Sequence, residues 1–138
     1  GVSEKPINPI ALVLESGATF VARLNPFNTK ESVRILKKAV KHKGFSFIEF
    51  LMPCIHFNNF SEFIKENSYE IKPLEKKDAL KKAREWEYNS LKRVPVGIFY
   101  EKQEKTFSEK RFILKNLLSN KIGFCNRNNR QSILKDFY

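Results

Sequence analysis

The apolar stretch Phe45–Met52, FSFIEFLM, constrains the fold of this chain more than any other segment. It is apolar at nearly every position, and Pro53 ends it. A strand of this kind is buried on both faces, as strands of parallel sheets usually are. An earlier apolar segment, 18–24, also has the pattern of a strand, and a helix-like segment, 28–44, lies between the two. Strand, helix and strand in this order predict a βαβ unit with parallel strands and a right-handed crossover.

Both helices of this region have start and stop signals. For a short helix over 9–16, Asn8 can cap the first turn and Gly17 suits a left-handed stop. For the longer helix, Asn28 and Glu31 have the spacing of a capping box. The apolar residues of the longer helix form one stripe at helical spacing, as in an amphipathic helix. They are Val33, Leu36 and Val40, joined by Ile35 and Ala39.

The second half predicts three further helices and one strand. Segment 60–71 has the pattern of a short helix, and 76–91 that of a longer one with Ala79, Ala83 and Trp86 on one side. Segment 94–101, VPVGIFYE, reads as a strand, because a proline near a strand start is tolerated. A last helix is predicted over 107–120, with Ser108 as a possible cap.

Size, cysteine content and charge set the broad class. The 138 residues suit one ordinary domain, and two cysteines give no disulfide framework. No signal peptide or membrane-spanning stretch is recognisable, so we expect a cytoplasmic protein. The net charge of +11 would attract nucleic acid, anionic lipid or an acidic protein, although a solvated basic surface explains it as well.

The motifs of common enzyme classes are absent from the sequence, and we assign no catalytic residue within it. Glu49 is a lone carboxylate in an apolar strand, which favours an edge or snorkelling position over a catalytic acid. Cys54 follows the expected carboxyl end of a strand, where α/β sheets collect ligands. From its residue type alone, a small buried thiol is the favoured interpretation.

Three blocks of sequence resemble the β subunit of 2-oxoacid:ferredoxin oxidoreductases, the family of the pyruvate and 2-oxoglutarate enzymes. They are NPIALVLESGATFVAR with KKAVKHKGFSFIEFLMPCIHFNN, then DALKKAREW, then RVPVGIFYEKQEKTF. The resemblance covers roughly 8–107, and its three blocks occur in the family's order. It does not extend to 108–138.

The resemblance implies an α/β fold, part of a thiamine-diphosphate-binding-type parallel sheet flanked by helices, with a C-terminal extension. It also implies that the whole enzyme decarboxylates a 2-oxoacid with thiamine diphosphate and Mg²⁺. Electrons then pass through a 4Fe-4S cluster to ferredoxin, and the acyl group passes to coenzyme A. Cys54 matches the family's Pro-Cys motif, whose cysteine is a cluster ligand. Thiolates are the usual ligands of such clusters.

The chain also departs from the family pattern. It lacks the Gly-Asp-Gly motif that holds thiamine diphosphate and Mg²⁺, and it lacks the other three cluster cysteines. Cys125 has no family counterpart, so no role is assigned to it. His56 stands where the family has another residue; it could hydrogen-bond near the site, but an exposed loop histidine is the favoured interpretation.

We therefore expect the C-terminal half of a β subunit, inactive as these 138 residues alone. Its partners would be the α subunit and ferredoxin, with no membrane. Residues 1–58 would complete the thiamine-diphosphate-binding domain, and 59–138 would form the C-terminal extension. Two alternatives are a basic α/β module that binds nucleic acid, which lacks any recognition motif, and a non-catalytic scaffold half.

Overall fold

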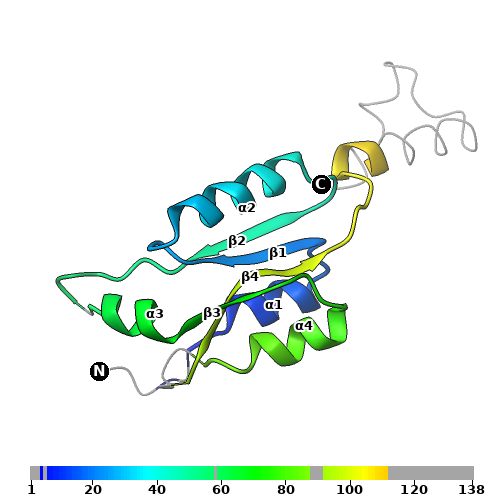
Figure 1. Cartoon of the computed structure of the whole chain (residues 1–138). Coiled ribbons are helices and arrows are strands. Elements are labelled where there is room, and N and C mark those ends of the chain that lie inside the picture. Colours follow the sequence, from blue (N-terminus) through cyan, green and yellow to red (C-terminus); the bar gives the residue numbers. More distant parts are fainter. Residues whose placement is uncertain (1–3, 5, 58, 88–91, 112–138) are drawn as a thin grey trace, which may run out of the picture. The chain divides into compact units, whose positions relative to one another are not determined.

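The computed structural model describes Glu4 and residues 6–57, 59–87 and 92–111 (Figure 1). The chain forms two compact units, Gly1–Glu104 and Lys105–Tyr138. The first unit holds eight elements among the described residues. They are α1 (Pro9–Glu15), β1 (Phe20–Leu24), α2 (Thr29–Lys41), β2 (Ser46–Phe50), α3 (Ser61–Asn67), β3 (Ser68–Ile71), α4 (Lys76–Ala83) and β4 (Val94–Glu101).

The described strands form one sheet in the order β2-β1-β4-β3. β1 pairs with β2 in parallel, which confirms the predicted βαβ unit. β3 and β4 are also parallel, but β4 runs antiparallel to β1 with a register shift between Val21 and Ala22. The α/β sheet flanked by helices is thus confirmed, and the sheet is mixed rather than wholly parallel.

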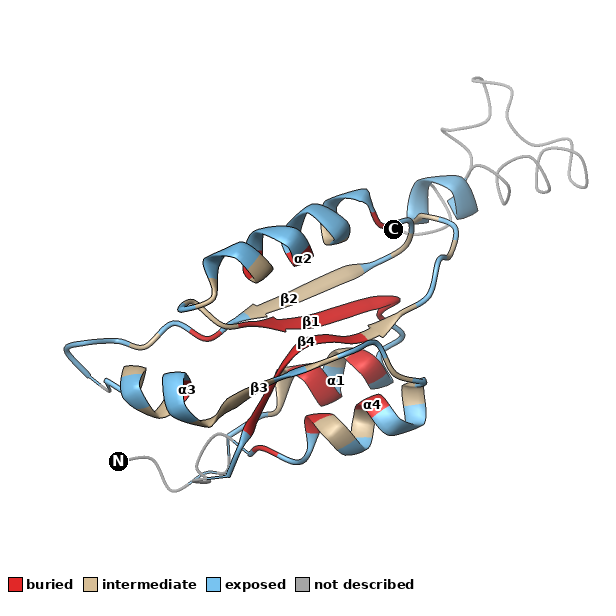
Figure 2. Ribbon diagram, viewed as in Figure 1, coloured by how far each residue is buried: buried red, intermediate tan, exposed pale blue. Residues whose placement is uncertain are grey.

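Helices cover both faces of the sheet and bury mainly its two central strands (Figure 2). α1 and α4 pack on one face, where Ile10 and Leu14 meet Val21 and Phe99. On the other face α2 packs over β1 and β2, and a second cluster forms there from Phe20, Ala22, Leu24, Ile35 and Ile98. β1 is buried throughout, whereas β2 is only partly covered.

The caps predicted at the starts of α1 and α2 are confirmed. The side chain of Asn8 accepts a hydrogen bond from the N–H of Ala11 at 3.1 Å. The side chain of Asn28 accepts one from the N–H of Glu31 at 3.2 Å, but the reciprocal bond of the predicted capping box does not form: the N–H of Asn28 donates to the carbonyl of Asn25 at 3.1 Å, and the Glu31 carboxylate pairs with Arg34. Gly17, after α1, has the left-handed φ of +91° that favours glycine.

The apolar stripe of α2 is divided between core and solvent. Ile35 is 1% exposed and lies on the sheet beside the small residues Ser32 and Ala39. The stripe's other residues are exposed: Val33 by 43%, Leu36 by 38% and Val40 by 85%. The helical pattern is therefore correct, but it includes residues that the first unit leaves uncovered.

The second half differs more from the prediction. Segment 60–71 is a helix followed by strand β3, because Ser68 turns extended directly after α3. α4 ends at Ala83, before Trp86, yet Trp86 is 3% exposed and belongs to the core with Ile64 and Val94. β4 matches the predicted strand. In the second unit residues 107–111 are helical, and 112–120 of that predicted helix lie outside the described residues.

The start of the helix in the second unit is capped differently from the prediction. Thr106, not Ser108, accepts a hydrogen bond from the N–H of Glu109, at 3.3 Å. The Glu109 carboxylate in turn accepts one from the N–H of Thr106 at 2.7 Å, which is the reciprocal arrangement of a capping box.

Candidate functional site: the loop at the carboxyl ends of the parallel strands

The loop 51–57 follows β2 at the end of the sheet where the parallel strands β1 and β2 both stop. Leu51 anchors it: its N–H donates to the carbonyl of Leu24 at 3.2 Å, and its side chain is 5% exposed. Because β2 ends at Phe50, Cys54 lies four residues beyond the strand rather than two. Its thiol is exposed, so the buried thiol favoured from residue type is wrong for the first unit as described.

The loop carries three exposed apolar side chains, on either side of Cys54 in the sequence. Met52 is 67% exposed, Ile55 73% and Phe57 94%. Such a concentration of exposed apolar residues within one loop is typical of a surface that another polypeptide covers. His56 lies in the same loop and is exposed, as predicted.

A buried ion pair lies in the strands that lead to this loop. Arg23, 0% exposed, donates from Nε to the Oε2 of Glu49 at 2.6 Å. Its Nη1 donates to the carbonyl of Pro95 at 3.2 Å, and the guanidinium lies over the rings of Trp86 and Phe99 at 5.0 and 5.3 Å. Glu49 does occupy an edge strand among the described residues, but it is not a lone carboxylate.

The sequence carries a signal for this pair, although the pair belongs to no known motif. The two parallel strands each carry one charged residue among apolar ones, and these residues have opposite sign. The register places Arg23 directly beside Glu49. Opposite charges on neighbouring strands stabilise each other, so the pair ties β2 to β1 just before the loop.

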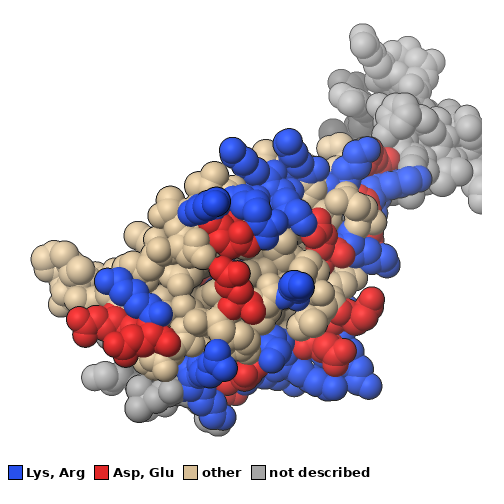
Figure 3. Space-filling model, viewed as in Figure 1, with Lys and Arg blue, Asp and Glu red and all other residues tan. Residues whose placement is uncertain are grey.

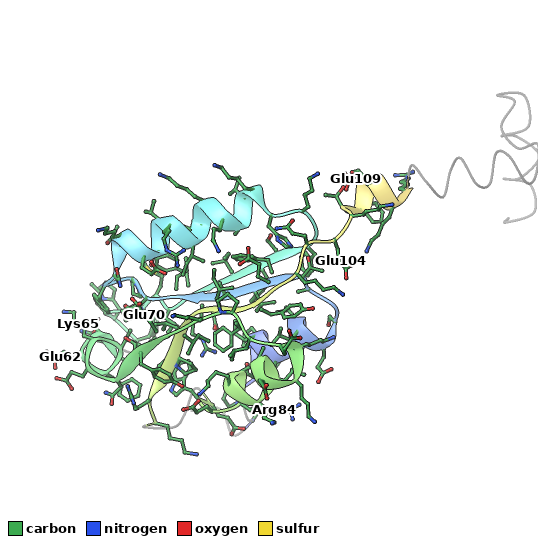
Figure 4. The ribbon with its side chains drawn as sticks, turned by 45° about the vertical axis from the view of Figure 1, so that its right-hand side comes forward. Glu62, Lys65, Glu70, Arg84, Glu104 and Glu109 are labelled. Atoms are coloured by element: carbon green, nitrogen blue, oxygen red, sulfur yellow. The ribbon has the colours of Figure 1, made fainter. Side chains whose placement is uncertain are left out.

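A polar cleft of about 230 Å³ opens between the start of α2 and strands β3 and β4. Asn28 donates to the carboxylate of Glu70 across it at 2.9 Å, and Asn25 donates to Ser68 at 2.7 Å. Glu70 and Lys65 come from β3 and α3 at the same end of the sheet (Figure 4). The two hydrogen bonds across the cleft tie the start of α2 to β3.

Ion pairs and burial shift the pKa values of several side chains near these elements. The hydrogen bond from Arg34 holds the pKa of Glu31 below its ordinary value, and that from Lys82 does the same for Glu85. Burial, followed by the hydrogen bond to Glu85, raises the pKa of Tyr69. These shifts follow from surface pairs and leave no poised acid or base among the groups named here.

A buried histidine, His42, lies at the opposite end of the sheet and contacts residues from two other segments there. The Nε2 of His42 lies 2.9 Å from the hydroxyl of Thr19, and its Nδ1 lies 3.3 Å from the amide nitrogen of Gln103. The Thr19 hydroxyl also accepts from the N–H of Phe45 at 2.8 Å. Burial lowers the pKa of His42, so the neutral ring is favoured.

The residues described do not form a complete metal site. No group of three or more His, Cys, Asp or Glu side chains among them could hold a metal ion. Cys54 can therefore offer one thiolate, and a cluster would need its remaining ligands from elsewhere. Cys125 lies outside the described residues. Within the described parts of the chain no helix is long and apolar enough to cross a membrane.

Basic side chains gather over α2 on the face seen in Figure 3. The helix carries five exposed ones: Lys30, Arg34, Lys37, Lys38 and Lys41. Two of them are paired with carboxylates, Arg34 with Glu31 and Lys38 with Glu101 at 3.2 Å. A second basic group lies on α4 and its end, with Lys76, Lys77, Lys81, Lys82 and Arg84, so α2 is one of two helices that carry the positive charge of the first unit.

Comparison with known proteins shows which class of protein this chain is similar to. The family model for the C-terminal region of the pyruvate ferredoxin oxidoreductase beta subunit matches residues 54–116. The chain is therefore a homologue of the β subunits of ferredoxin-dependent 2-oxoacid oxidoreductases, and the resemblance seen in the sequence is confirmed.

Individual relatives agree with this assignment. The chain is 36% identical over 127 residues to 2-oxoacid:ferredoxin oxidoreductase 1, subunit beta, of Aeropyrum pernix, covering 80% of this chain and 39% of that protein. It is 37% identical over 120 residues to the corresponding β subunit of Saccharolobus solfataricus, covering 76% and 39%. The chain thus spans about two fifths of the length of these curated relatives.

A solved structure shares the fold. The 2-oxoglutarate:ferredoxin oxidoreductase from Magnetococcus marinus, with 2-oxoglutarate, coenzyme A and succinyl-CoA bound, aligns with a TM-score of 0.76 and 23% identity. The alignment covers 96% of this chain and 46% of that chain. The fold of this chain is therefore contained within a longer chain of that enzyme.

Proposed function

We propose that this chain forms the C-terminal part of the β subunit of a cytoplasmic 2-oxoacid:ferredoxin oxidoreductase, of class EC 1.2.7. In the assembled enzyme a 2-oxoacid loses carbon dioxide, its acyl group forms a thioester with coenzyme A, and the released electrons reduce ferredoxin. The observation that carries the proposal is the exposed Cys54 in the loop after β2, within the region that the family model matches.

Cys54 is the residue of this segment that we propose as a ligand of the 4Fe-4S cluster. A thiolate suits an iron–sulfur cluster, and Leu51 fixes the start of its loop on the sheet. The exposed apolar neighbours of Cys54 would line a site closed by other parts of the enzyme, and a low-polarity surrounding is one means of setting a cluster potential. The other ligands would come from outside these 138 residues.

Thiamine diphosphate and Mg²⁺ would be held by other parts of the enzyme, because this segment has no Gly-Asp-Gly motif. The first 58 residues would complete the thiamine-diphosphate-binding domain, and 59–138 would be the C-terminal extension of the subunit. The isolated chain should therefore bind thiamine diphosphate weakly and turn over no substrate. Micromolar binding in isothermal titration calorimetry would contradict this.

The test of Cys54 uses the assembled oxidoreductase, with its α subunit, and compares Cys54→Ser with Cys125→Ser. We expect Cys54→Ser to lower bound iron and sulfide and to change or remove the electron paramagnetic resonance signal of the reduced cluster. Cys125→Ser, at the other cysteine of the chain, should leave both unchanged. An intact cluster signal and full iron content in Cys54→Ser would refute the assignment.

The basic residues of α2 are a candidate docking surface for ferredoxin. Ferredoxins of this family are acidic, and complementary charge speeds encounter. Reduction of ferredoxin by the assembled enzyme should therefore slow as ionic strength rises, and less so when Lys37 and Lys41 are both replaced by Gln. A rate of reduction that does not depend on ionic strength would remove α2 from this role.

A further inference from the structure

The loop that carries Cys54 is tied to the first unit on both sides. It lies between β2 and α3 (Figure 1). Leu51 at its start and Ile64 in α3 are both buried, at 5% and 0% exposed, and both belong to the apolar cluster of Trp86. Cys54 is three residues from Leu51, so its backbone lies within about 11 Å of that anchor. The cysteine therefore stays close to the end of the strands, although its thiol is exposed.

The buried ion pair of Arg23 and Glu49 lies in the same region. The guanidinium of Arg23 is 5.0 Å from the centre of the Trp86 ring, and Glu49 precedes Leu51 by two residues. Water and salt screen a pair at this depth only weakly, because Arg23 is 0% and Glu49 12% exposed. The charges of this pair therefore act on the adjoining loop more strongly than those of a surface pair.

Glu49 is the member of the pair that is nearer to Cys54 along the chain. It stands in β2, the strand that continues into the loop, whereas Arg23 stands in β1, one strand further into the sheet. Cys54 follows Glu49 by five residues, so the two backbones are at most about 18 Å apart. A negative charge shielded from water is thus held within a short reach of the thiol.

We propose that Glu49, held in place by Arg23, lowers the reduction potential of the cluster that Cys54 binds. The cluster takes up one electron released from the 2-oxoacid and passes it to ferredoxin, and a negative charge nearby opposes that uptake. A donor to ferredoxin needs a low potential, because ferredoxins themselves have low potentials. Arg23 is then a positioning residue, since it acts through Glu49. The inference rests on the proposed function in taking Cys54 as a cluster ligand.

The size of the effect follows from the charge and the reach of the chain. At an effective dielectric constant of about 20, one unit charge about 10–18 Å away changes the equilibrium for adding an electron roughly five- to fifteenfold. Because a tenfold change corresponds to about 59 mV for a one-electron couple, this is about 40–70 mV. The contributions of separate charges add, so removing the charge of Glu49 should give this shift even though Arg23 remains.

The test is a redox titration of the assembled oxidoreductase at pH 8, followed by the electron paramagnetic resonance signal of the reduced cluster. Glu49→Gln keeps an oxygen that can accept from the Nε of Arg23 but removes the negative charge. It should raise the midpoint potential by about 40–70 mV. Glu101→Gln is the matched control, because Glu101 pairs with Phe20 at the other end of β1 and forms an ion pair with Lys38. It should give less than half of that shift.

A second variant separates charge from position by the sign of its effect. Arg23→Gln removes the positive charge, keeps an amide that can donate to Glu49, and should lower the midpoint potential. Its shift should be the smaller of the two, because Arg23 is one strand further from the loop. A pair that only holds β2 against β1 would instead reduce bound iron in both variants and leave the midpoint of the remaining clusters unchanged. Each variant tests the inference by itself if the other does not assemble.

The outcomes separate this inference from the proposed function. An unchanged midpoint in Glu49→Gln, an equal shift in Glu101→Gln, or shifts of the same sign in Glu49→Gln and Arg23→Gln overturns the role of Glu49. Iron and sulfide content of Cys54→Ser, measured in parallel, tests the ligand independently. Loss of the cluster in Cys54→Ser with an unshifted midpoint in Glu49→Gln keeps the proposed function and refutes this inference alone. A cluster retained in Cys54→Ser refutes the ligand and the inference that rests on it.

Discussion

Replacing Glu49 by Ala should destabilise the chain strongly, because it strands a charge in the core. Arg23 is wholly buried, and Glu49 is 12% exposed and lies 2.6 Å from it. A guanidinium left without its carboxylate cannot reach water without displacing its aromatic neighbours Trp86 and Phe99. The variant thus removes a partner and leaves the cost of burying the charge.

The magnitude follows from what remains around Arg23. Breaking a buried pair by removing one partner costs about 3–5 kcal/mol. The hydrogen bond to Pro95 and the two aromatic faces continue to stabilise the cation, and each such contact is worth about 0.5–2 kcal/mol. We therefore expect the lower end of the range, about 3 kcal/mol, in the free energy of unfolding.

Urea unfolding of a double-mutant cycle measures this directly. Glu49→Ala, Arg23→Met and the pair Arg23→Met with Glu49→Leu are compared with the parent chain. The double replacement removes both charges and should be far milder than Glu49→Ala, since apolar residues of similar volume often replace a buried pair at little cost. A loss below about 1 kcal/mol for Glu49→Ala, or a double variant as unstable as the single ones, would refute the reasoning.

Two further predictions concern His42 and Gly97. Because burial lowers the pKa of His42 below its ordinary 6.5, the contribution of His42 to stability is present above pH 6.5 and is lost as pH falls. Protonation of the ring would also set an N–H against the amide nitrogen of Gln103. His42→Gln should therefore flatten the pH dependence of the unfolding free energy between about pH 7 and 5, and an unchanged slope would exclude His42 as its source. Gly97→Ala should lower the free energy of unfolding, measured in urea, by more than about 2 kcal/mol, because φ is +116° and the added Cβ would lie 2.6 Å from the carbonyl oxygen of Ile71. Gly17→Ala is the control, because Gly17 has a φ of +91° and open space around it, so this variant reports the backbone strain alone. Equal losses of stability in the two variants would show that the contact with Ile71 is harmless.

Features set by neighbouring residues could be predicted from the sequence. Asn8 and Asn28 cap their helices, and β4 has the predicted bounds, because a cap or a strongly β-branched run depends on a few adjacent residues. The parallel pairing of β1 and β2 followed from the strand–helix–strand order alone.

Features set by distant partners could not. α3 runs directly into β3, and Asn67 with Ser68 gives only a weak local sign that the helix ends there. Pairing with β4 decides where the strand begins. The position of Trp86 outside α4 likewise depends on contacts with Ile64 and Val94. At the candidate site, the loop of Cys54 was found from its place after a strand, but its exposure depends on what the rest of the first unit leaves uncovered.

The antiparallel seam between β1 and β4 has a consequence for how the chain is made. Phe20 pairs with Glu101, so the two parallel strand pairs, β1 with β2 and β3 with β4, join through strands that are far apart in sequence. Contacts of such long range carry the largest loop-closure cost and form slowly. During synthesis β1 has only one neighbour until Val94–Glu101 has left the ribosome, and its other edge remains open to pairing with foreign strands. A nascent chain that pauses before residue 94 is therefore the species most in need of a chaperone.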